Sequence, residues 1–176
     1  MTTDKATLER HLGYTTWATD QLLKAVSVIP AEQLTRDFHT ADRNIIGTIA
    51  HVFAADRVWL DRVQGRRRTV FIEDRDRDLL VLNGEWPRLL AGWKEWLAAL
   101  DEDHIQAPIS YHDIQGNPWQ SSPWEIILHI VNHGTHHRGQ VSGFLRALGH
   151  TPPPLDLIRF YRTSEPQART VASPHS

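Results

Sequence analysis

Residues 122–149 constrain the fold of this chain more than any other segment, because both ends and the interior follow the rules of one long helix. Ser122, Pro123 and Glu125 form a capping box with proline at the first helical position. Gly149 is a typical residue just after a helix end. The segment therefore predicts a helix of about seven turns, which must bury its apolar stripe against other helices.

Three histidines lie on this predicted helix at a spacing of four residues: His129, His133 and His137. At 100° per residue, His133 and His137 fall in the middle of the apolar stripe and His129 on its edge. The stripe consists of Ile126, Ile130, Val141, Phe144 and Leu148. A buried imidazole without a partner carries a desolvation cost, so two stacked in a core need a shared explanation. A bound metal ion supplies one.

The pair alone does not establish a metal site, because eleven of the 176 residues are histidine. At that frequency about 0.7 pairs at this spacing arise by chance. A third ligand is needed from another helix, and His51 is the best candidate. Its helical face carries small neighbours, Gly47, Thr48 and Ala55, which leave room for an ion. The alternative for His51 is a core histidine bonded to a backbone group or a hydroxyl.

Composition and charge exclude several classes of protein. The length fits one domain. A net charge of −2 argues against a dedicated nucleic-acid binder. The absence of cysteine excludes disulfides, thiolate metal ligands and a cysteine nucleophile. We see no signal region and no apolar run of 18 residues, so we expect a cytoplasmic protein that does not span a membrane.

Apolar spacing predicts three further long helices. The first covers about residues 5–28, and the second covers 45–64, with Asn44 as its N-cap. The third ends near Leu100, and its start is open: Pro87 suits a first turn, yet the chain from Asp78 could add an earlier one. We therefore expect an all-α protein, a four-helix bundle.

Segments outside the helices are also predicted. A short hairpin or an extended loop covers residues 109–120. The run at 66–68, three arginines followed by acidic residues, is interpreted as a solvated loop. Three consecutive prolines at 152–154 exclude helix there. We place the domain at residues 1–162 and expect a disordered tail at 163–176.

Two stretches of the chain resemble a known family. Residues 44–51 and 55–60 resemble the second helix of the DinB (DinB/YfiT-like) proteins, and residues 129–140 resemble their fourth helix. The ending at 148–156 is also similar, and the resemblance covers about residues 5–162. It implies a four-helix bundle with up-up-down-down topology, usually a homodimer, that holds a divalent metal with three histidines.

Carried over by motif position, the metal ligands that the resemblance implies are His51, His133 and His137, and His129 is a neighbour that is not normally a ligand. Neutral imidazoles without a thiolate suit zinc, nickel or iron. We expect zinc or nickel first, with iron or manganese as alternatives. Three protein ligands leave a coordination position open, which is typical of a catalytic site.

Other polar residues are candidates for supporting roles. Carboxylates that could accept the outer N–H of a ligating histidine, or else form surface ion pairs, are Asp20, Asp56 and Glu125. Arg138 could bind an anionic substrate, although a structural or dimer contact is the more usual role. Asn132 and Gln140 could hydrogen-bond within the cleft or simply pack. His136 is interpreted as a boundary residue.

The leading functional hypothesis is a metal-dependent enzyme acting on a small molecule. The resemblance includes transferases that use low-molecular-weight thiols such as bacillithiol or mycothiol, whose thiolate the metal would stabilise. Hydrolysis through a metal-activated water is a second option. The competing hypothesis is a non-catalytic, metal-binding helical dimer that binds a ligand or acts in a stress response. No general acid or base can be assigned from the sequence.

Overall fold

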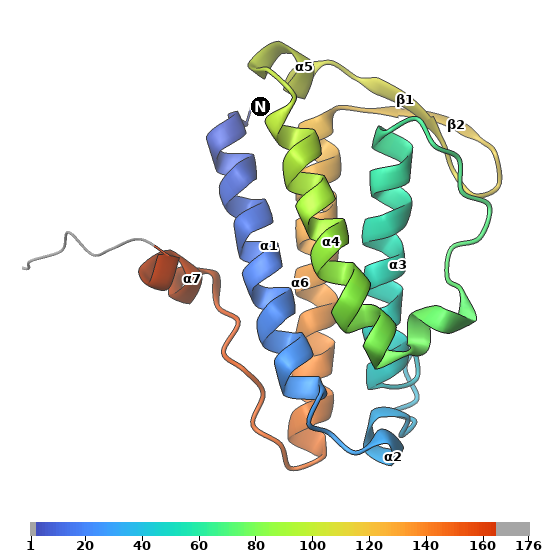
Figure 1. The fold of residues 1–176 in the computed structure, drawn as a ribbon, viewed down its shortest axis with the longest axis vertical. Helices are drawn as coiled ribbons and strands as arrows, with labels where there is room; N and C mark the ends of the chain where they lie inside the picture. Colours follow the sequence, from blue (N-terminus) through green and yellow to red (C-terminus); the bar gives the residue numbers. More distant parts are fainter. Residues whose placement is uncertain (1–2, 165–176) are drawn as a thin grey trace, which may run out of the picture.

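Four long helices lie side by side in the computed structural model, which describes residues 3–164 (Figure 1). They are α1 (Lys5–Val26), α3 (Ile45–Val63), α4 (Leu79–Ala98) and α6 (Pro123–Ala147). The helices α1 and α3 each pack against both α4 and α6. The protein is therefore mostly helical, as the sequence predicts.

The predicted signals at the ends of α3 and α6 are confirmed. The Asn44 side chain accepts a hydrogen bond from the backbone N–H of Gly47 at 2.8 Å. The N–H of Ser122 donates to the Glu125 carboxylate at 2.8 Å, which completes the capping box of α6. Gly149 follows α6 with a φ of 84°, a backbone conformation that glycine adopts at little cost.

Of the two predicted starts of α4, the earlier one near Asp78 is confirmed and the one at Pro87 is wrong. The helix begins at Leu79 with Asp78 as its N-cap, so Pro87 lies in the helix interior and not in the first turn. A proline there removes a backbone hydrogen bond, at a cost of about 3 kcal/mol. Leu82 and Trp86, on the turns just before it, are almost completely buried. Burial of these two large side chains offsets the cost. Helix propensity alone does not indicate this burial.

The shorter elements connect and cover the four helices. The hairpin between α4 and α6 is confirmed: β1 (Ile109–His112) and β2 (Pro118–Ser121) pair antiparallel, with Ile109 opposite Ser121. Four short helical segments were not predicted from the sequence: α2 (Ala31–Leu34), the 3₁₀ helix η1 (Asp74–Arg77), α5 (Glu102–Gln106) and α7 (Leu157–Ser164). After the prolines, α7 packs against α1 and buries Phe160.

The core consists of two clusters of buried side chains. One includes Ile45, Phe53 and Trp86, and the other includes Leu12 and Trp93. Of the predicted tail, residues 163 and 164 belong to α7, and the rest lies outside the described residues. Within residues 3–164 no helix has the length and hydropathy that a membrane span requires.

Candidate metal centre

His51 from α3 meets His133 and His137 from α6 at one point between the two helices. One ring nitrogen of each histidine lies within 4.8 Å of the others. The Nε2 atoms of His51 and His133 are 3.0 Å apart. The ring of His137 lies 4.6 Å from that of His51 and 4.5 Å from that of His133, between centroids. The structure thus brings together the three residues that the sequence singled out.

The donor set fits a divalent cation. In a tetrahedral zinc site the zinc–nitrogen bonds are about 2.1 Å, which puts the nitrogens about 3.4 Å apart. Burial, and then the neighbouring His137 and His51, lower the pKa of His133 to about 3. Burial also lowers the pKa of His137. Both imidazoles are therefore neutral at pH 7 and carry the lone pair that a metal needs.

The three histidines lie at the rim of the core and not within it. All are partly buried. The side chain of His51 is 28% exposed and that of His137 is 12% exposed. The helical wheel placed His133 and His137 in the middle of the apolar stripe, but α3 and α6 leave that part of the stripe partly open. The site can consequently be reached from outside the bundle.

Asp42, in the loop before α3, is the carboxylate beside the histidines. Its Oδ1 lies 3.5 Å from Nδ1 of His51, and its Oδ2 lies 3.7 Å from Nδ1 of His137. One carboxylate therefore faces the outer nitrogen of two of the three candidate ligands. Such an outer partner fixes the tautomer and the ring orientation of a ligating histidine.

None of the three carboxylates considered from the sequence occupies this position. Asp20 pairs with Lys24, Glu125 caps α6, and Asp56 accepts a hydrogen bond from Trp86 in the core. Asp42 was missed because it lies in a loop, where side-chain position does not follow helical periodicity. The only signal in the sequence was its nearness to the N-cap of α3.

Tight local geometry holds the Asp42 loop. Arg43 has a φ of 67°, which is unusual for a residue with a side chain, and its guanidinium pairs with Asp37 at 2.6 Å. A Cβ at Gly47 would lie 2.2 Å from the backbone oxygen of Asp42, which is impossible. Glycine at 47 is therefore what lets the loop lie against the first turn of α3.

Of the remaining polar candidates on α6, one hydrogen-bonds a candidate ligand and the others do not. Gln140 bonds His137, with 2.7 Å between its Oε1 and Nδ1, so it lies in the cleft as considered. His129 is exposed, and its ring lies 5.9 Å from that of His133 and 5.2 Å from that of Trp59. His136 and Asn132 are also exposed. His129 and His136 border the site without joining the ligand group, whereas Asn132 lines a separate pocket with Tyr14.

Arg138 points from α6 toward α1 and not toward the histidines. It is 2% exposed, its Nη2 donates to Thr135 at 3.1 Å, and its guanidinium lies over the Tyr14 ring at 5.3 Å. It follows His137 directly, yet one residue turns a helix by 100°. Its role is therefore to pack α6 against α1, and the structural alternative considered for it is the better one.

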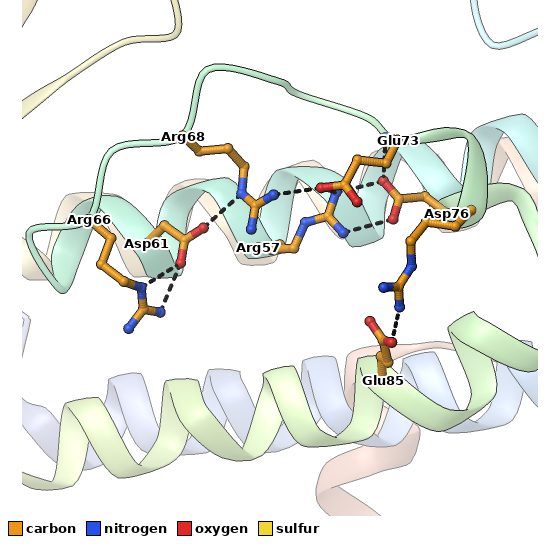
Figure 2. A network of polar contacts seen from close by, with 8 residues as sticks. Arg57, Asp61, Arg66, Arg68, Glu73, Asp76 and Glu85 are labelled. Atoms are coloured by element: carbon orange, nitrogen blue, oxygen red, sulfur yellow. Dashed lines mark hydrogen bonds and ion pairs between the residues drawn. The ribbon is translucent and has the colours of Figure 1, made fainter.

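The loop after α3 covers the outside of that helix. Figure 2 shows arginines and carboxylates alternating along it, with Arg68 bonded to both Asp61 and Glu73 and with Arg57 bonded to Asp76. The arginine run at 66–68 is thus partly an ordered ion-pair network and not simply a solvated loop. The same loop brings the Phe71 ring to 5.2 Å from His51.

Comparison with known proteins identifies the family of this chain. The model of the DinB family matches residues 1–169. The chain belongs to the DinB family. It is 20% identical over 151 residues to Protein DinB of Bacillus subtilis (strain 168), which covers 81% of this chain and 87% of that protein.

A solved structure shares the fold of this DinB family member. The crystal structure of a DinB-like protein from Bacillus cereus ATCC 10987 aligns with a TM-score of 0.58 and 21% identity. The alignment covers 82% of this chain and 94% of that one. At this level of identity the likeness concerns the fold alone.

Proposed function

We propose that this protein binds a divalent metal ion through His51, His133 and His137 and uses it in an enzymatic reaction on a small molecule. The observation that carries the proposal is the convergence of three ring nitrogens from two helices within 4.8 Å of one another. Zinc and nickel suit three neutral imidazoles best, with iron and manganese as alternatives. Such an ion would supply Lewis-acid chemistry at a position that the protein leaves open.

The access to the site favours catalysis over a purely structural ion. A structural zinc site uses four protein ligands, and among residues 3–164 the ligand group contains three. The outward exposure of His51 gives a ligand a way in. A low-molecular-weight thiol is the co-substrate class that we favour, because its sulfur would take the open position and become a thiolate there. Hydrolysis is the second enzymatic candidate.

The chain's own residues would orient this chemistry. Gln140 hydrogen-bonds the outer nitrogen of His137, and the Asp42 carboxylate faces the outer nitrogens of His51 and His137, so the inner nitrogens are directed to a common point. Phe71 packs against His51 and limits water on that side. The wider proposal includes the up-up-down-down helix order, a homodimer, a cytoplasmic location and a link to stress responses, which the family suggests. A non-catalytic metal-binding dimer is the alternative.

Metal analysis of untagged protein tests the proposal. We expect close to one divalent ion per chain, and a loss of at least 100-fold in affinity for His133→Ala, because two imidazoles cannot hold the ion alone. His136→Ala is the matched control and should bind normally, since His136 lies outside the ligand group. Full metal retention in a His51→Ala, His133→Ala double variant would overturn the assignment.

Turnover is tested separately, with an electrophile and a panel of bacterial thiols. We expect metal-dependent conjugation that His137→Ala abolishes. Metal binding without turnover on any thiol or ester substrate would support the non-catalytic alternative.

A further inference from the structure

The ion-pair network along α3 leaves two arginines without a carboxylate partner. Three arginines of this region are neutralised by nearby acidic groups: Arg57 by Asp76, Arg66 by Asp61, and Arg68 by Asp61 and Glu73 (Figure 2). Over residues 3–164, Arg62 and Arg67 form no ion pair within 4.0 Å. A chain with a net charge of −2 thus keeps two arginines without an ion-pair partner close together.

These two arginines line a small cavity between the end of α3 and the hairpin. Its volume is about 80 Å³, and its walls are Arg62, Gly65, Arg66 and Arg67 on one side and Ser110, Tyr111 and His112 of β1 on the other. Apart from Gly65, each of these residues has a polar group in its side chain. The walls supply guanidinium N–H groups and no carboxylate, which is the composition of an anion site.

Aromatic rings fix the position of Arg62. Its guanidinium lies 4.4 Å from the centre of the Trp59 ring and 5.5 Å from that of Tyr111. Stacking on a ring face leaves the N–H groups at the edge of the guanidinium plane free to bind an oxyanion. The side chain is therefore ordered before any ligand arrives, which lowers the entropic cost of binding.

The hydroxyl of Ser110 adds a neutral donor. Its Oγ accepts a hydrogen bond from Gln120 at 3.1 Å, so its own proton is free to donate. The Asp113 carboxylate interacts electrostatically with Arg62 and offsets part of its positive charge. Its carboxylate is held by Asn117 at 2.8 Å and Trp119 at 3.0 Å, away from an ion pair with Arg62.

We propose that this pocket binds the anionic group, a phosphate or a carboxylate, of a small molecule. Arg62 follows His51 by eleven residues, which places it about 16 Å along α3 and only about 20° around it. The rings of His129 and Trp59 lie between the two positions, 5.2 Å apart. An anionic ligand held at the pocket therefore lies on the face of α3 that leads to the metal centre.

Titration of the metal-free full-length protein with inorganic phosphate, at constant ionic strength, tests the pocket directly. We expect saturable binding that weakens at least about tenfold in Arg62→Gln and in Arg67→Gln, because each removes a charge-assisted hydrogen bond. Arg88→Gln is the matched control, since Arg88 is exposed on α4 and forms no ion pair among the described residues. It should bind phosphate normally.

The outcomes separate this proposal from the metal site, because no metal is present in the titration. Absence of saturable binding, or equal weakening in Arg88→Gln, would overturn it. A parallel titration with succinate distinguishes the two chemical groups: tighter phosphate binding assigns a phosphate ligand, and tighter succinate binding assigns a carboxylate. Arg62→Lys guards against misfolding, because it keeps the charge and should retain weakened, saturable binding.

Discussion

The three histidines of the metal centre and the buried residues Asp56 and Arg138 both come from α3 and α6, but the two sets differ in exposure to solvent. His51 and His137 are 28% and 12% exposed, whereas Asp56 and Arg138 are 1% and 2% exposed. The histidines converge on a point that a ligand can reach. Asp56 instead accepts hydrogen bonds from two core tryptophans, so it acts within the protein itself.

Asp56 joins the two halves of the core. Its side chain accepts a hydrogen bond from Trp86 at 2.8 Å, and its backbone oxygen accepts one from Trp93 at 3.1 Å. Trp86 belongs to one buried cluster and Trp93 to the other. Burial raises the pKa of the Asp56 carboxyl to about 7, which keeps a large part of it neutral near physiological pH.

The two regions differ in what their polar atoms contact, and these contacts distinguish a binding site from a structural group. The outer nitrogens of His51 and His137 face Asp42, which leaves their inner nitrogens for a ligand. Asp56 uses its oxygens to orient two tryptophans. We therefore expect substitutions in the two regions to affect different properties, metal affinity in one and stability in the other.

Among substitutions in the buried region around Asp56, Trp86→Ala should lower the free energy of unfolding most. Removing a tryptophan that is 1% exposed leaves a cavity, which costs about 3–5 kcal/mol of unfolding free energy. It also removes the donor to Asp56. Urea denaturation measures the loss. Trp119→Ala, at a tryptophan that is 56% exposed, should cost less than about 1 kcal/mol, and equal losses would contradict the assignment of Trp86 to the core.

Asp42→Asn should weaken metal binding about 10–100-fold with little change in stability, because the outer partner of two ligands loses its charge. Competition with a metal-sensitive dye measures the affinity. Asp74→Asn is the control, since that carboxylate is fully exposed on η1. Gly47→Ala should act in the same direction by displacing the Asp42 backbone. Unchanged affinity in both variants would remove Asp42 from the site.

Asp56→Asn should change how the unfolding free energy depends on pH. The native state holds a proton on Asp56 up to about pH 7, whereas the unfolded chain releases it near its ordinary pKa of 3.8. Between pH 4 and 7, Asp56 therefore lowers the unfolding free energy as pH rises, by at most about 1.4 kcal/mol per pH unit. The variant lacks this contribution.

The stability of Asp56→Asn relative to the natural chain should consequently increase from pH 4 to pH 7 in urea denaturation. The lowered pKa of His133 acts with the opposite sign in part of that window, but it is common to both proteins and cancels in the difference. A difference that stays constant with pH would show that Asp56 titrates normally.

Local rules predicted the helix ends, and tertiary burial explains where they failed. The caps at Asn44 and Ser122 act within one turn of their helices, so they can be recognised without the fold. The position of Pro87 inside α4 could not be predicted without the fold, because its cost is offset by the burial of side chains against other helices. The short segments α2, η1 and α5 were missed for a different reason: each has too few residues to show a helical period.

The sequence predicts the helical class and singles out the three histidines, because spacing along a helix indicates which side chains share a face. It leaves residues 109–120 open as a hairpin or an extended loop. The packing of the folded chain places Asp42 beside two of the histidines, buries Arg138 and makes Arg62 and Arg67 line a cavity. These features depend on how a loop or a second helix packs against the first. Such contacts join residues far apart in the chain, and no local pattern records them.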